Sequence, residues 1–197
     1  MKSNRWAYSL SGLFVFAFTG MWSFNHFSFN STHTVGQEID SLNGVVVFYN
    51  GGVDNVSGRN LTANGYNLGL KYQCVEFVKR YYYEHLKHEM PDSYGHAIDF
   101  FDKSLADGQK NKRRALTQYA NPSQTKPKVD DLVVLSGTVA NKYGHVAIIS
   151  DVMENEVEII QQNPGPFGKS RERFLLENSN GKWRIDNKRI LGWLRKE

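Results

Sequence analysis

The chain holds a single cysteine, Cys74, at the head of a segment whose apolar residues follow a helical repeat. One cysteine cannot form an internal disulfide bond. A thiol on the first turn of a helix lies near the positive end of the helix dipole, which favours the thiolate. Because the thiolate is the nucleophilic form of cysteine, this placement predicts covalent chemistry. Free cysteine is also among the most buried residue types, so a packing role is the competing interpretation.

A cysteine nucleophile needs a base within hydrogen-bond reach and a third group that orients the base, and His145 is well placed to be that base. It lies near the start of an apolar segment, 144–151, that reads as a strand. If this strand pairs with the next one, 156–163, residue 161 lies near residue 146. An amide from Gln161 or Asn163 can then orient the imidazole ring, and both residues fall on the same face of the strand.

Two other histidines, His85 and His88, lie one turn apart on the predicted helix beside Glu84 and Glu89. Their order matches neither His-Glu-x-x-His nor His-x-x-Glu-His. A pair of ligands is a weak match to a metal centre. The sequence therefore predicts neither a metal site nor a cofactor.

Several pieces of the chain resemble a known family in the same order. The pieces are Gln73-Cys74-Val75-Glu76-Phe77, Gly144-His145-Val146-Ala147-Ile148, Gln162-Asn163 and Gly192-Trp193. They resemble the CHAP family of cysteine, histidine-dependent amidohydrolases/peptidases. Within that family they are most similar to the amidase domains of bifunctional glutathionylspermidine synthetase/amidases. The resemblance runs from about Gly44 to Arg195.

The resemblance implies a papain-like fold with Cys74 as the nucleophile and His145 as the base. The third position is commonly the Glu of a Glu-Gln-Asn run, and here Gln161 takes its place. A neutral amide accepts the imidazole N–H but offers no charge to the imidazolium. Lys79 stands where the amidases typically have arginine, and lysine lacks the forked donor that binds a carboxylate.

The oxyanion of the reaction is expected to bind the backbone N–H of Cys74 at the helix N-terminus, with Gln73 as a weaker candidate. Together, the expected oxyanion and substrate-binding side chains are those of Gln73, Lys79 and Gln162.

The order of the predicted elements indicates an α+β fold. A short strand at 44–49 precedes a Gly- and Asn-rich loop at 51–71. Helices are then expected at 72–88 and 94–106. Strands follow at 131–135, 144–151, 156–163, 171–176, 183–185 and 190–194. Helices followed by antiparallel strands predict N-terminal helices packed on an antiparallel sheet.

The first 24 residues differ from the rest. Lys2 and Arg5 precede a stretch without ionisable side chains, 6–24, that is just long enough to span a bilayer as a helix. It is interpreted as a membrane helix acting as a signal anchor, or else as a cleaved signal peptide. Either places the following domain outside the cytoplasm, periplasmic or extracellular, and secreted if the segment is cleaved. The predicted division is 1–24 as this segment, 25–43 as a linker and 44–197 as the CHAP-like domain.

The charge is mildly basic, with a net value of +4 over 197 residues, and most basic residues are dispersed. The densest run, 110–114, has no interleaved aromatic residues and is interpreted as a solvated face. No nucleic-acid partner is therefore predicted.

The hypothesis for function is hydrolysis of an amide through a thioester on Cys74. The export signal favours peptide or amide bonds of peptidoglycan as the substrate. The resemblance to the amidases makes glutathionylspermidine the alternative. A hypothesis of another class is a weak or inactive module that binds peptide or cell wall, in which Gln161 marks a decayed site.

Overall fold

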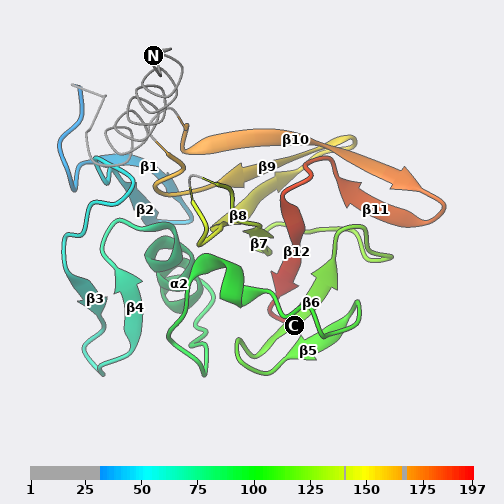
Figure 1. Ribbon diagram of the computed structural model, residues 1–197, viewed down its shortest axis with the longest axis horizontal. Coiled ribbons are helices and arrows are strands. Elements are labelled where there is room, and N and C mark those ends of the chain that lie inside the picture. The colour runs from blue at the N-terminus through cyan, green and yellow to red at the C-terminus, as the bar shows by residue number, and fades with distance from the viewer. Residues whose placement is uncertain (1–31, 140, 166–167) are drawn as a thin grey trace, which may run out of the picture.

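A long antiparallel sheet dominates the described part of the chain, residues 32–139, 141–165 and 168–197 of the computed structural model (Figure 1). Its strand order is β11-β10-β9-β8-β7-β12-β6-β5. The elements in chain order are β1 (Glu38–Leu42), β2 (Val45–Phe48), β3 (Arg59–Leu61), β4 (Asn67–Leu70), α2 (Cys74–Glu84), the 3₁₀ helix η1 (Ala97–Phe100), β5 (Gln109–Asn111), β6 (Leu116–Ala120), β7 (Leu132–Leu135), β8 (His145–Val152), β9 (Glu156–Ile160), β10 (Arg171–Ser179), β11 (Lys182–Ile185) and β12 (Ile190–Arg195).

Both faces of the central strands are buried, because side chains alternate between two hydrophobic clusters. On β8, Val146 and Ile148 belong to the cluster that includes residues of α2. Ala147 and Ile149 belong to the second cluster, on the other face. These strands therefore read as near-continuous apolar runs although they pair antiparallel.

The second face is covered because the sheet curls back on itself. The backbones of Ser123 and Trp183 exchange two hydrogen bonds, of 3.0 and 2.7 Å. Ser123 follows β6, near one end of the strand order, whereas Trp183 lies on β11 at the other end. The curl encloses Trp193 and its neighbours between the two arms.

Two small sheets flank α2. β1 pairs with β2 around the turn at Asn43 and Gly44, and β3 pairs with β4. β1 falls within the segment 25–43, which the sequence predicts to be a linker, and β3 and β4 fall within the predicted loop 51–71. The β3–β4 pairing supplies the strand that leads directly into α2.

The predicted α+β, papain-like arrangement of several N-terminal helices on a sheet is wrong, because the described residues are mostly β with one α-helix. Only the helix predicted at 72–88 forms, as α2, and the segment 94–106 contains just the short η1. Asp102 accepts hydrogen bonds from the N–H and hydroxyl of Ser104, a local turn that competes with helical bonds. The antiparallel sheet itself is as expected.

The predicted membrane helix of residues 1–24 lies outside the described residues. Within the described ranges, no helix has the length and apolar character needed to cross a bilayer.

Candidate active site

Cys74 is the first residue of α2, and the elements before it fix where the helix begins. Gln73 has an extended backbone, with φ −88° and ψ 158°, so the helix starts immediately after it. β4 passes against the first turn so closely that a Cβ on Gly69 would lie 3.2 Å from the backbone nitrogen of Glu76. The apolar stripe of the helix, including Phe77 and Tyr81, then packs into the core and holds this end in place.

The head of β8 lies directly beside this helix end. The backbone N–H of Val146 donates a hydrogen bond to the sulfur of Cys74. His145, the preceding residue, is the first of β8, at the strand start that the sequence predicts, and it is buried. Gly144 lets the chain enter β8 close against β7, because a Cβ there would lie 2.6 Å from the carbonyl oxygen of Leu135.

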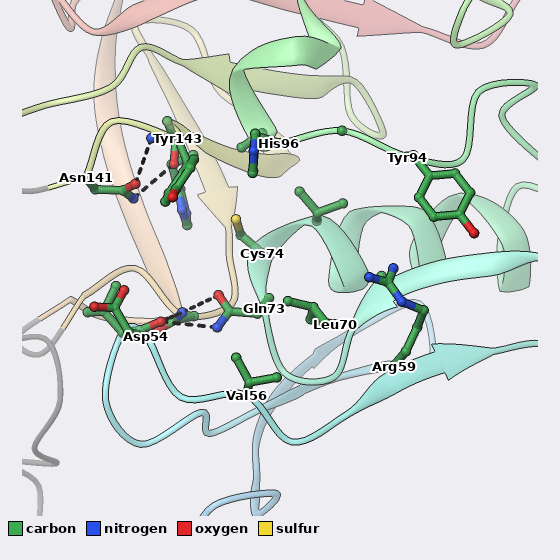
Figure 2. A pocket seen from close by; sticks show the side chains of 18 of the residues that line it. Asp54, Val56, Arg59, Leu70, Gln73, Cys74, Tyr94, His96, Asn141 and Tyr143 are labelled. Carbon is green, nitrogen blue, oxygen red and sulfur yellow. Dashed lines mark hydrogen bonds between the residues drawn. The ribbon is translucent and has the colours of Figure 1, made fainter.

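Cys74 and His145 line one cleft of about 490 Å³. Its walls come from the loop after β2, the ends of β4 and α2, the segment before η1 and the loop before β8 (Figure 2). Among the described residues no hydrogen bond joins Cys74 to His145. Catalytic hydrogen bonds often form only when substrate binds, so two residues that line one cleft remain candidates for a nucleophile and its base.

Gln161 contacts the imidazole ring of His145. Its side-chain oxygen lies 2.9 Å from Nε2 of His145. Its amide nitrogen donates to the carbonyl of Lys169 at 3.1 Å and to the carboxylate of Glu172 at 3.4 Å. Because these acceptors fix the amide nitrogen, the oxygen must face the ring, and Nε2 carries the proton. Nδ1 is then the unprotonated nitrogen of His145.

Asn163, the other predicted orienting residue, has a different contact. Its amide nitrogen donates to the carbonyl of Val53 at 2.9 Å and to the side-chain oxygen of Gln73 at 2.7 Å. The amide nitrogen of Gln73 in turn donates to the carbonyls of Val53 and Asn55, at 3.1 and 2.8 Å. Both donors of Gln73 are therefore engaged with the loop wall, which leaves the backbone N–H of Cys74 as the expected oxyanion donor.

Gln162 and Lys79 are buried beneath the cleft, away from its surface. Gln162 accepts from the N–H of Phe48 at 2.7 Å and donates to the carbonyl of Gln73 at 3.0 Å and the carboxylate of Glu76 at 2.9 Å. The ammonium of Lys79 donates to backbone carbonyls. Both side chains are fully buried, so neither can contact a substrate directly as the sequence suggested.

Burial disfavours a charge on either member of the pair. It raises the pKa of the Cys74 thiol to about 11, and the N–H of Val146 opposes this only in part. Burial lowers the pKa of His145 to about 4; the hydrogen bond to Gln161 opposes this, and the nearby charge of Arg189 adds to it. The resting pair is therefore a neutral thiol and a neutral imidazole, although the helix dipole alone predicts a thiolate.

Several cleft residues were not predicted from the sequence. They are Asn141, Tyr143, His96, Tyr94 and Arg59, all contributed by loops or a short edge strand. The rings of His96 and Tyr143 lie 4.3 Å apart between centroids. Figure 2 shows these two residues on the side of the cleft toward which the sulfur of Cys74 points. No periodic pattern marks loop residues, so the sequence carried no signal for them.

The two histidines weighed as metal ligands have other partners. His85 lies 3.2 Å from the side-chain nitrogen of Asn43, and His88 lies 2.8 Å from the carbonyl oxygen of Arg114. Within the described ranges no group of three His, Cys, Asp or Glu side chains is arranged to hold a metal ion.

Comparison with known proteins agrees with the resemblance seen in the sequence. The CHAP domain family matches residues 63–163. Trypanothione synthetase from Crithidia fasciculata is 29% identical over 137 residues, which cover 64% of this chain and 21% of that protein. Bifunctional glutathionylspermidine synthetase/amidase from Escherichia coli (strain K12) is 30% identical over 138 residues, covering 64% of this chain and 22% of that protein.

A weaker match is the crystal structure of Ly7917, with a TM-score of 0.36 and 16% identity over 64% of this chain and 53% of that chain. The chain spans about a fifth of the length of the curated relatives it matches. The family match covers residues 63–163, more than half of the chain and both Cys74 and His145. The protein belongs to the CHAP domain family, and its relatives support an amidase- or peptidase-like function.

Proposed function

We propose that the protein is a cysteine-dependent amide hydrolase that acts through a thioester on Cys74. The observation that carries the proposal is the arrangement around the cleft. The sulfur of Cys74 is hydrogen-bonded to the residue after His145, and His145 is oriented from behind by Gln161. A nucleophile, a base and an orienting group in this order are what acyl transfer requires.

The chemistry begins from the neutral pair. Nδ1 of His145 takes the thiol proton while the sulfur attacks the amide carbonyl. The N–H of Cys74 stabilises the oxyanion. The C–N bond then breaks, and the imidazolium returns its proton to the leaving amine. His145 next takes a proton from water, the hydroxide attacks the thioester, and the acid leaves as the thiol is restored.

The substrate that we favour is a peptide or amide bond of peptidoglycan, reached outside the cytoplasmic membrane. The support is the basic and then apolar N-terminal sequence, whose residues lie outside the described ranges. The similarity to bifunctional glutathionylspermidine synthetase/amidase supports glutathionylspermidine as the second candidate.

The test is to incubate the full-length protein separately with peptidoglycan and with glutathionylspermidine and to identify released amines by mass spectrometry. Cys74→Ala should stop release, and a brief acid quench of the wild type should trap the acyl group on the protein. The chain has one cysteine, so a thioester can form only at Cys74. Release that continues in Cys74→Ala contradicts the mechanism. Retained binding without any release by the wild type points instead to a binding module.

A further inference from the structure

Positive charge gathers at one end of the cleft, where three cations lie near one another without a carboxylate partner. They are Arg59, Lys79 and Arg114. Among the described residues, none of the three forms an ion pair with Asp or Glu. We propose that this end of the cleft binds a carboxylate group of the substrate, with Arg59 in direct contact. The inference rests on the proposed amide hydrolase function and narrows its substrates to acidic ones.

Arg59 is the cation that a substrate can reach. It lies on β3, its side chain is exposed, and it lines the cleft together with Tyr94. One nitrogen, Nη1, donates to the side-chain oxygen of Asn67 at 3.0 Å, and the guanidinium lies 5.7 Å from the centroid of the Tyr94 ring. A guanidinium has five N–H donors, so most of them stay available, and a planar fork fits a carboxylate. The two contacts hold the group in place before substrate arrives.

The other two cations lie beneath the same wall. Lys79 and Arg114 are fully buried. Lys79 donates to the carbonyls of Asn67 and Ser93. Arg114 donates to the carbonyls of Asp92 and Tyr94. Carbonyl dipoles and the faces of two aromatic rings therefore stabilise these charges, with Lys79 4.6 Å from the centroid of Tyr66 and Arg114 3.8 Å from that of Phe100. Arg114 belongs to the basic run 110–114, which the sequence predicted to be solvated.

The three charges are close enough to affect one another. Burial, the charge of Arg114 and the charge of Arg59 together lower the pKa of Lys79 to about 8, while Asp92 opposes them. Asp92 is itself paired with Arg113, at 2.7 Å. A positive potential thus remains over this end of the cleft, and low-dielectric walls strengthen its effect on a bound anion.

The space between Cys74 and Arg59 is apolar. Figure 2 shows Leu70 lying between them, with Val56 on the neighbouring wall. Leu70, Val56 and Val75 line this part of the cleft. A substrate that fits has its scissile carbonyl at Cys74, a weakly polar segment over Leu70 and a carboxylate at Arg59. Acidic peptides of the cell wall and glutathionyl compounds share this chemistry.

Binding to the full-length Cys74→Ala variant, measured by calorimetry, tests the site without turnover. Two probe pairs differ by one carboxylate. The first is γ-glutamyl-cysteinyl-glycine against 4-aminobutyryl-cysteinyl-glycine. The second is the wall tripeptide L-Ala-γ-D-Glu-L-Lys against its isoglutamine form. The acidic member of at least one pair should bind about tenfold more tightly, as expected for a charge-assisted hydrogen bond. The pair that responds identifies the source of the carboxylate.

Substitutions then assign the effect to Arg59. Arg59→Gln in the Cys74→Ala background should remove the difference between the two members of the pair, and Arg59→Lys should restore part of it. Arg184→Gln, a half-exposed arginine on β11, is the matched control and should change nothing. Three results overturn the site. They are equal binding of both members of each pair, no binding of any probe, and a difference in affinity between the members that is unchanged in Arg59→Gln.

The outcome is separable from that of the proposed function. Arg59-dependent binding of the acidic probes without any amide release by the wild type leaves the carboxylate site standing and refutes the hydrolase. Amide release that does not change with Arg59→Gln or with removal of the substrate carboxylate supports the hydrolase and refutes the carboxylate site.

Discussion

The side-chain oxygen of Gln161 lies 2.9 Å from Nε2 of His145, and the amide nitrogen of Gln161 is held by Lys169 and Glu172. This chain of contacts fixes both the orientation of the ring and the nitrogen that carries the proton. The glutamine was expected to weaken support for the base. It lacks a charge of its own, but the carboxylate of Glu172 lies directly behind it.

Replacement of Gln161 tests this support. Gln161→Leu removes the side-chain hydrogen bond that His145 makes within the described part of the chain and lets the ring turn or change tautomer, so kcat should fall by about 10²-fold. Gln161→Glu places a carboxylate against Nε2 and should keep most of the activity. Steady-state kinetics with the substrate identified by amine release measure both. Gln124→Leu, at an exposed loop position, is the control. Full activity of Gln161→Leu contradicts the role.

The pH dependence of turnover follows from the neutral resting pair. The pKa of His145 is lowered to about 4, and only the unprotonated ring can accept the thiol proton. The ratio kcat/KM should therefore rise with pH through about 4 and already be high at pH 6. Gln161→Glu should move this acid limb to higher pH, since a carboxylate favours the imidazolium. A wild-type limb at about 6.5, the value of an ordinary histidine, contradicts the assignment.

The local pattern of the chain was enough to predict the parts of the site that belong to one element. Cys74 begins the helix and His145 begins the strand, and the antiparallel pairing of 145–151 with 156–162 is confirmed. Each depends on an apolar periodicity that a short stretch of sequence displays. The predicted register, with 161 beside 146, is one residue out, because Ile148 lies opposite Ile160 and a bulge follows Ile149. The sequence could not decide whether Gln161 or Asn163 orients His145, because both residues lie on the same face of a strand.

The remaining features depend on contacts between distant segments. The side chain of Gln162 is buried because β2 and α2 meet over it. Lys79 is buried because the start of β4 at Asn67 and the loop at Ser93 close above it. Polar residues are normally exposed, so the sequence alone favours the wrong environment for both. Distant contacts also help to explain why the described residues contain one α-helix, since the N–H of Ile98 donates to the carbonyl of Tyr143 and the N–H of Asp102 donates to the side chain of Gln118.

The buried amide of Gln162 should contribute strongly to stability. It joins the backbone of Phe48, the backbone of Gln73 and the carboxylate of Glu76, so Gln162→Leu leaves buried polar groups without partners. A loss of about 3 kcal/mol in the free energy of unfolding is expected. Urea denaturation followed by fluorescence measures it. Gln124→Leu should be nearly neutral, and a similarly small loss in Gln162→Leu rules out this role.

Lys79 makes the stability of the fold depend on pH in a predictable direction. Its pKa falls from 10.5 to about 8 on folding, chiefly through burial. Between these two values the unfolded chain holds a proton that the folded chain has lost, so the free energy of unfolding rises with pH. Relative to Lys79→Met, wild type should gain on the order of 2–3 kcal/mol from pH 8 to pH 10.5. Thermal or urea denaturation at several pH values measures the difference. Lys182→Met, at an exposed position of β11, corrects for loss of a surface charge. A difference between wild type and Lys79→Met that is constant or falls with pH refutes the prediction, because the ammonium would then be as well solvated in the fold as in water.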